Sequence, residues 1–246
     1  MYVTAPQMAD LMPDARQLLS DEPEMESTRH YQQLALLVSS LEWHWRERND
    51  FFIGANLTVY YTHQQLRRRE FRGPDFFLVR DTHREPRNSW VVWEEEGRYP
   101  DLIIELLSDS TAGVDRTDKK SLYQNIFRTP EYFWFSPMTL EFTGFRHSGQ
   151  QYEPILPDER GWRWSEVLEL YLGVANHQLR YFNLTGDLIP TPAEAAEREI
   201  RQAVQERQRA EREHQRAERE HQRAEQERQR AKHLAQRLRE LGVEPD

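Results

Sequence analysis

The sequence predicts an α/β or α+β domain with a mixed central sheet and flanking helices, followed by a long charged helix. Three observations support this. A segment with helical spacing opens the body and several β-type segments follow it. Residues 101–135 then show the order strand, helix, strand, which is typical of a crossover within a sheet. Near Pro190 the composition changes abruptly. We therefore divide the chain into a globular domain, 1–190, and a helix, 191–246.

Hydrophobic spacing predicts the elements of the body one by one. Residues 29–48 carry apolar side chains three and four apart, which predicts a helix with one buried face. Runs rich in aromatic and β-branched residues predict strands at 51–61, 76–79, 89–94, 101–107, 132–135, 140–146, 151–155 and 179–183. A helix is expected at 116–128, ending before Pro130, and a short helix at 164–172.

The tail repeats a seven-residue unit close to QRAEREH. Alanine recurs every seven residues from Ala203 to Ala231, and Leu238 continues the series. A helix from about 192 to 241 is expected, with a capping box at its start and Gly242 as its C-terminal cap. Alanine alone makes a weak coiled-coil seam. We therefore expect a helix stabilised by Glu–Arg pairs three residues apart, such as Glu206 with Arg209.

Apolar packing in the tail is confined to its last turns. A homodimer, or binding of a partner protein, is therefore expected to depend on Leu234, Leu238 and Leu241. His214 and His221 lie seven residues apart on one face of the helix. We interpret them as solvated side chains and not as metal ligands.

Composition excludes several classes of protein. There is no cysteine, so disulfides and thiolate chemistry are absent. The first residues do not resemble a signal peptide, and no apolar run approaches the roughly 18 residues of a membrane span. These features predict a cytoplasmic protein without a membrane partner. Residues 194–246 hold 13 acidic and 13 basic residues, so the net charge of −9 belongs to the body.

An acidic body argues against bulk electrostatic attraction to nucleic acid. It does not exclude a nuclease, because metal-binding carboxylates add negative charge themselves. The arginines within 64–72 could face phosphates locally, or they could lie on a solvated loop. Charge alone therefore leaves both interpretations open.

One carboxylate stands out in the expected central strand. Glu105 interrupts an apolar run, where an unpaired charge is costly. Asp101 points to the same face, but four residues at 3.3 Å each place it about 13 Å away, too far to share one metal ion. Asp101 follows a proline and suits a turn. We select Glu105; the alternative is a buried glutamate paired with an arginine.

Lysine is rare in this chain, and two lysines follow that strand. Of 33 basic residues only Lys119, Lys120 and Lys232 are lysines, although codon bias would also explain this. A compact ammonium beside carboxylates and a metal suits phosphodiester hydrolysis. Lys119 shares an apolar helix face with Leu122, Tyr123 and Ile126, at helical spacing. It is therefore expected to point inward to a carboxylate or phosphate, unless its stem merely passes the core.

A third candidate opens another strand. Asp75 follows the turn signal Gly73-Pro74 and precedes an apolar strand. Aspartate is common in turns, so Asp75 is a site candidate only if its strand neighbours that of Glu105.

Together these segments resemble the Uma-two family of endonucleases, within the PD-(D/E)xK, restriction-endonuclease-like superfamily. The shared pattern is Pro74-Asp75, then Pro100-Asp101-Leu102 with Glu105 and Ser108, then Asp115 with Lys119 and Tyr123, then Pro130-Glu131-Tyr132. The resemblance covers nearly all of residues 20–190.

The resemblance implies cleavage of nucleic acid, with DNA the expected substrate, and Mg²⁺ or Mn²⁺ as cofactor. It assigns the two metal-binding carboxylates to Asp75 and Glu105. The lysine that usually follows two residues after the glutamate is replaced here by Leu107, and Lys119 resembles a migrated substitute. A glutamate on the first helix often completes such a site. Glu26 is the nearest match, with Glu22 and Glu24 close by. A different class remains open: a non-catalytic protein that keeps this fold and uses the long helix as a scaffold.

Overall fold

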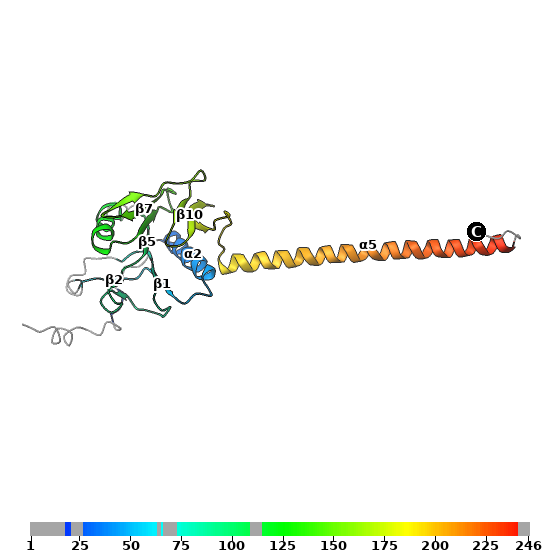
Figure 1. The fold of residues 1–246 in the computed structure, drawn as a ribbon, viewed down its shortest axis with the longest axis horizontal. Coiled ribbons are helices and arrows are strands. Elements are labelled where there is room, and N and C mark those ends of the chain that lie inside the picture. The colour runs from blue at the N-terminus through cyan, green and yellow to red at the C-terminus, as the bar shows by residue number, and fades with distance from the viewer. Residues whose placement is uncertain (1–17, 21–26, 63–64, 66–72, 109–114, 241–246) are drawn as a thin grey trace, which may run out of the picture. The chain divides into compact units, whose positions relative to one another are not determined.

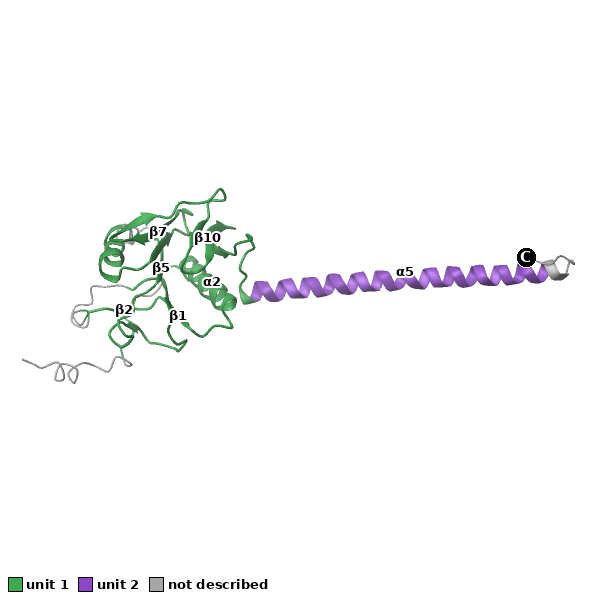
Figure 2. Ribbon diagram, viewed as in Figure 1, with its two compact units in different colours: residues 1–192 green, residues 193–246 purple. Residues whose placement is uncertain are grey.

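The structure is a computed structural model that describes residues 18–20, 27–62, 65, 73–108 and 115–240. Glu26, most of the arginine-rich segment 64–72, and the end of the tail from Leu241 onward lie outside these described residues. The side chain of Leu238 is likewise not described. The chain forms two compact units, Met1–Pro192 and Ala193–Asp246, which Figure 2 colours separately.

A six-stranded mixed sheet forms the centre of the first unit (Figure 1). Its strand order is β1-β3-β5-β6-β7-β8, in which β5 and β6 run parallel and the other neighbours antiparallel. The bounds are β1 (Phe51–Ala55), β3 (Phe76–Arg80), β5 (Leu102–Leu106), β6 (Glu131–Phe135), β7 (Phe142–Ser148) and β8 (Gln151–Pro154). The predicted mixed α/β fold is confirmed.

Helix α2 (Thr28–His44) covers one face of this sheet. Ser27 caps it, because the Ser27 hydroxyl accepts a hydrogen bond from the His30 N–H at 3.3 Å. Its buried leucines recur three and four residues apart and join the larger hydrophobic core: Leu34, Leu37 and Leu41. The helix packs on β1 and on β11 of a smaller sheet.

The opposite face carries a second core. The connection from β5 to β6 is one helical segment made of η3 (Asp115–Lys119), α4 (Lys120–Leu122) and η4 (Tyr123–Phe127). Both of its ends have π-type winding, which is wider than that of an α-helix. A short parallel pair, β2 (Val59–Tyr60) and β4 (Trp90–Val91), also contributes residues to the buried clusters of this region.

One predicted element is wrong. Residues 164–172 were expected to form a helix, but they belong to β9 (Arg163–Ser165), a turn, and β10 (Leu170–Ala175). The turn contains Glu169 at φ 56°, which a helix does not allow. Strand β10 pairs with β9 and with β11 (Gln178–Phe182) in an antiparallel sheet. Tertiary contacts therefore override the helical spacing of Trp164, Val167 and Leu168.

Glu131 supplies the contacts that hold this turn. It is 1% exposed, and it accepts hydrogen bonds from the Ser165 hydroxyl and from the Glu166 N–H. Arg146 forms an ion pair with it at 3.0 Å. A charge-assisted network of this kind stabilises the turn more than a local helix would.

Gly54 marks a close approach inside the main sheet. It lies opposite Phe77 in the β1–β3 register, and the Phe77 ring covers it. A methyl group at residue 54 would fall inside the van der Waals radius of that ring, and Phe77 is fully buried.

The variant Gly54→Ala is therefore expected to lower the free energy of unfolding by about 1–3 kcal/mol through overpacking. Chemical denaturation would measure this. In the double variant with Phe77→Leu, which removes part of the ring volume, the two losses should be less than additive. Additive losses would show that residue 54 does not depend on the Phe77 ring.

The second unit consists of α5 (Pro192–Glu240), a helix of 49 residues. At 1.5 Å per residue it is about 74 Å long. His214 and His221 are exposed on it, each 3.8–3.9 Å from a glutamate four residues further on. Glu197 and Arg201, also four residues apart, form an ion pair at 3.4 Å.

The body is expected to fold without this helix. The buried core clusters are built from residues up to Ile189. A chain that ends after Pro192 should therefore keep its thermal midpoint within a few degrees, measured by circular dichroism at 280 nm. Loss of cooperative unfolding in the shortened chain would place the domain boundary elsewhere.

Across the described residues, none of the helices has both the length and the apolar character needed to cross a bilayer.

Candidate active site

The candidate site lies at the centre of the main sheet, around β5. Alternate residues of a strand face opposite sides. Leu102, Ile104 and Leu106 join the core beneath α2, whereas Ile103 joins the core beneath η3–α4–η4. Glu105 faces that second side, where helical side chains contact it.

The side chain of Glu105 is fully buried. Burial raises its pKa to about 7. The Lys119 ammonium lowers this pKa, the neighbouring Asp75 raises it, and the hydrogen bond from Tyr123 lowers it. A carboxyl with such a pKa takes up or releases a proton near neutral pH, and a nearby cation favours its charged form.

Asp75 lies directly beside Glu105. In the antiparallel β3–β5 register Phe77 faces Ile103, and continuing by two residues places Asp75 opposite Glu105. The Asp75 carboxylate accepts a hydrogen bond from the Leu106 N–H at 2.7 Å. The Asp75 N–H lies 3.4 Å from Glu105 Oε2. The strand of Asp75 thus neighbours that of Glu105, the condition under which Asp75 is a site candidate.

Lys119 reaches the same carboxylate from the helical segment. Its Nζ lies 3.1 Å from Glu105 Oε2 and 3.5 Å from the carbonyl oxygen of Gly73. The lysine side chain is 13% exposed. The partner of the buried glutamate is therefore a lysine and not the arginine of the alternative interpretation.

The winding of this segment corrects the expected helix face. Lys119, Tyr123 and Phe127 follow one another at intervals of four, and the latter two are buried. Ile126, which α-helical spacing places on the inner face, is 52% exposed. The cause is the wider π-type winding. Residues four apart still share a face in it, but a residue three positions after Tyr123, such as Ile126, turns away from that face.

The structure brings together Asp75, Glu105 and Lys119. Glu26 lies outside the described residues, so that candidate stays a prediction. Asp101 lies at the other end of β5, where it accepts a hydrogen bond from the Arg80 N–H at 2.7 Å. Lys120 lies 3.5 Å from the centre of the Phe145 ring, a cation–π contact away from the carboxylates.

The family model Uma2, described as "Putative restriction endonuclease", matches residues 18–185. The chain belongs to the Uma2 family. This is the Uma-two family of the sequence motifs, so that resemblance is confirmed.

Two further comparisons accompany the Uma2 match. A solved structure, described as "a putative nuclease belonging to DUF820 from Anabaena variabilis ATCC 29413", is similar at 14% sequence identity and a TM-score of 0.42. The match covers 60% of this chain and 76% of that chain. No curated protein matches this chain.

The candidate site holds two neighbouring carboxylates, those of Asp75 and Glu105. Within the part of the chain that the structure describes, no cluster of three or more His, Cys, Asp or Glu side chains could hold a metal. Mg²⁺ commonly uses one or two carboxylates and completes its shell with water and phosphate oxygens. Asp75 and Glu105 fit such an ion, since a cation beside them would offset the burial that chiefly raises the Glu105 pKa and the repulsion from Asp75 that adds to it.

Tyr123 is the residue of this Uma2 site that sequence reasoning missed. Its hydroxyl donates a hydrogen bond to Glu105 Oε1 at 2.7 Å. Its position four residues after Lys119 was visible in the motif, but it was taken only as an apolar core residue. Residues four apart share a face in an α-helix as well, so the spacing already placed Tyr123 beside Lys119. What the sequence did not indicate is that the Tyr123 hydroxyl contacts Glu105.

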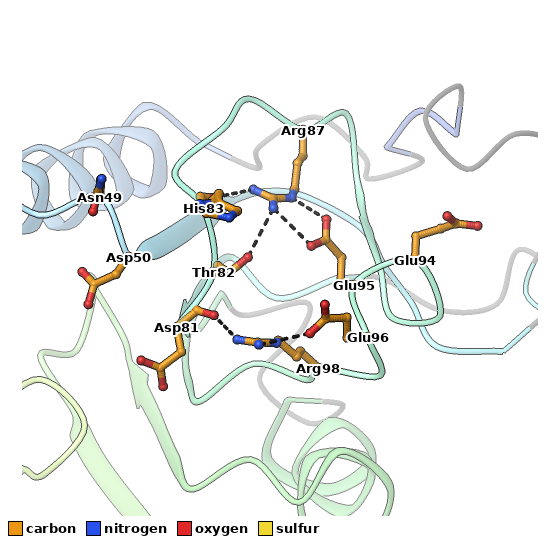
Figure 3. Close-up of a pocket in the computed structure, with 10 residues that line it drawn as sticks. All are labelled: Asn49, Asp50, Asp81, Thr82, His83, Arg87, Glu94, Glu95, Glu96 and Arg98. Atoms are coloured by element: carbon orange, nitrogen blue, oxygen red, sulfur yellow. Dashed lines mark hydrogen bonds and ion pairs between the residues drawn. The ribbon is translucent and has the colours of Figure 1, made fainter.

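A separate polar cavity lies elsewhere in the Uma2 domain (Figure 3). It has a volume of about 450 Å³. Its two arginines are paired within the cavity, Arg87 with Glu95 and Arg98 with Glu96. None of Asp75, Glu105 and Lys119 lines it. An anionic ligand would have to break an ion pair to bind there, so we do not place the chemistry in this cavity.

Proposed function

We propose that this Uma2 protein is a Mg²⁺-dependent endonuclease that hydrolyses phosphodiester bonds of nucleic acid, with DNA as the expected substrate. One observation carries the proposal: fully buried Glu105 lies beside Asp75, with the Lys119 ammonium 3.1 Å from its carboxylate. Burying the Glu105 carboxylate in an ion pair with a mostly buried lysine is costly compared with apolar side chains of similar volume. A catalytic role would explain why the chain keeps these charged side chains at the centre of the sheet.

Each side chain has a distinct role in this proposal. Asp75 and Glu105 would hold the Mg²⁺ ion, which Mn²⁺ could replace. Such an ion makes water a better nucleophile and neutralises charge on phosphoryl oxygens. Lys119 supplies a positive charge to the negative charge that develops during cleavage. Its ion pair with Glu105 keeps the ammonium in place before the substrate binds.

A cleavage assay tests this function. Supercoiled plasmid, single-stranded DNA and RNA are incubated with the full chain and Mg²⁺ or Mn²⁺, in parallel with EDTA. We expect EDTA to abolish the cleavage of at least one substrate. Intact products from all three substrates in both metals would contradict the proposal.

A second candidate function is a non-catalytic scaffold that binds a partner through α5. The observation in its favour is a polar helix of 49 residues attached to a body that carries the net charge of −9. A chain that ends after Pro192 separates the two. The nuclease should keep its cleavage activity after truncation, whereas a scaffold would show no metal-dependent cleavage in either form.

A further inference from the structure

Two helical side chains hold the two oxygens of Glu105 separately. Tyr123 donates to Oε1 at 2.7 Å, while the Lys119 ammonium and the Asp75 N–H approach Oε2 at 3.1 and 3.4 Å. A contact at each oxygen fixes the rotation of the carboxylate plane. Oε2 is thereby the oxygen that lies against the Asp75 backbone N–H and the Lys119 ammonium.

The spacing of four residues within the segment η3–α4–η4 makes this arrangement feasible. Lys119 ends η3 and Tyr123 begins η4, and both point to Glu105. Single π-type turns are uncommon and occur frequently at functional sites. The surroundings hold the Tyr123 ring firmly, since it packs against Phe127 and Tyr132 with ring centroids 5.4 Å apart in each case.

We propose that Tyr123 is a positioning residue for Glu105: its hydroxyl turns the carboxylate so that Oε2 faces Asp75 and the metal ion. This rests on the proposed function. Tyr123 itself contacts neither metal nor substrate. Partners of metal-binding side chains commonly contribute about 10–100-fold to metal affinity.

A second buried tyrosine, Tyr152, provides a matched control, because its hydroxyl has only a structural contact. Tyr152 is buried in the same core cluster as Tyr123. Its hydroxyl donates to the backbone carbonyl of Thr129 at 3.0 Å. Tyr123→Phe and Tyr152→Phe therefore each remove one buried phenol hydroxyl, and only the first hydroxyl contacts the candidate site.

The test measures Mn²⁺ binding to the full-length protein by electron paramagnetic resonance at pH 8. Wild type, Tyr123→Phe, Tyr152→Phe and Glu105→Gln are compared, with thermal unfolding as the measure of folding. We expect Tyr123→Phe to bind Mn²⁺ about tenfold more weakly, and Tyr152→Phe to bind it as tightly as wild type.

Cleavage provides a second readout. In Tyr123→Phe the Mn²⁺ concentration for half-maximal cleavage should rise about tenfold, and the rate at saturating Mn²⁺ should recover to near the wild-type value. Because Mn²⁺ that binds the folded protein would also stabilise a merely destabilised variant, the thermal unfolding of Tyr123→Phe and the Tyr152→Phe control are needed to separate the two effects.

These measurements distinguish failure of the positioning role of Tyr123 from failure of the nuclease proposal. Equal Mn²⁺ affinity in Tyr123→Phe and Tyr152→Phe, with Glu105→Gln impaired, overturns the positioning role and leaves the nuclease proposal standing. If wild type binds Mn²⁺ no more tightly than Glu105→Gln, the metal site and the inference built on it are both overturned.

Discussion

Replacing Glu105 by glutamine is expected to reduce metal-dependent cleavage by at least about 10³-fold, equivalent to about 4 kcal/mol of transition-state stabilisation. Glutamine keeps the volume of the side chain but removes the charge that binds the cation. Because burial raises the pKa of Glu105 to about 7, the fold already accommodates a neutral side chain there. The variant should therefore remain folded, as judged by circular dichroism.

The control for this prediction is Glu131→Gln. Glu131 is also buried and lies on the adjacent strand, but its partners are Arg146, Ser165 and the Glu166 N–H. This variant should lose stability and keep its cleavage activity. If both variants lose activity equally, the loss reports damage to the sheet and not removal of a metal ligand.

The raised pKa also fixes the sign of a pH effect. The folded pKa of Glu105, about 7, lies above the ordinary value of 4.5. Its stabilising contribution is therefore complete below about pH 4.5 and is lost as the pH rises through 7. Relative to Glu105→Gln, wild type should lose stability over that interval. Metal-dependent cleavage should change in the opposite sense, falling up to about tenfold per pH unit below 7, since the carboxyl must ionise to bind metal.

Much of this site could be predicted from local sequence rules. Glu105 stood out because it interrupts an apolar strand, where a charge needs a partner. Lys119 stood out because lysine is rare and the spacing turned it inward. The role of Asp75 depended on which strands are neighbours. Strand order is a property of the whole sheet, so only the family resemblance supplied that role beforehand.

The errors have physical causes of the same kind. The helical spacing of 164–172 is real, but the buried carboxylate of Glu131 holds that segment in a turn from a strand more than 30 residues away. The outward position of Ile126 follows from wide winding, which an α-helical repeat cannot represent. Tertiary contacts decided both cases, and single-sequence spacing does not contain them.

Replacing Lys119 by methionine is expected to lower the cleavage rate about 10²–10³-fold, because it removes the positive charge next to the developing negative charge. Methionine keeps the length and the apolar stem of the side chain. Losing the ammonium also removes an interaction that lowers the Glu105 pKa. The pH at which cleavage is half-maximal should therefore move upward. A pH–rate profile separates the two effects, since raising the pH restores ionised Glu105 but not the missing charge.

The adjacent lysine provides the control. Lys120 differs from Lys119 by one position in the chain, yet its Nζ lies over the Phe145 ring and not on a carboxylate. Lys120→Met should change the rate by less than about threefold and leave the pH profile in place. Only Lys119 of these two lysines contacts Glu105. Equal losses of rate in the two variants would therefore mean that positive charge near the site matters and that the contact with Glu105 does not. A profile of Lys119→Met that recovers the full wild-type rate at high pH would instead assign Lys119 to tuning the Glu105 pKa alone.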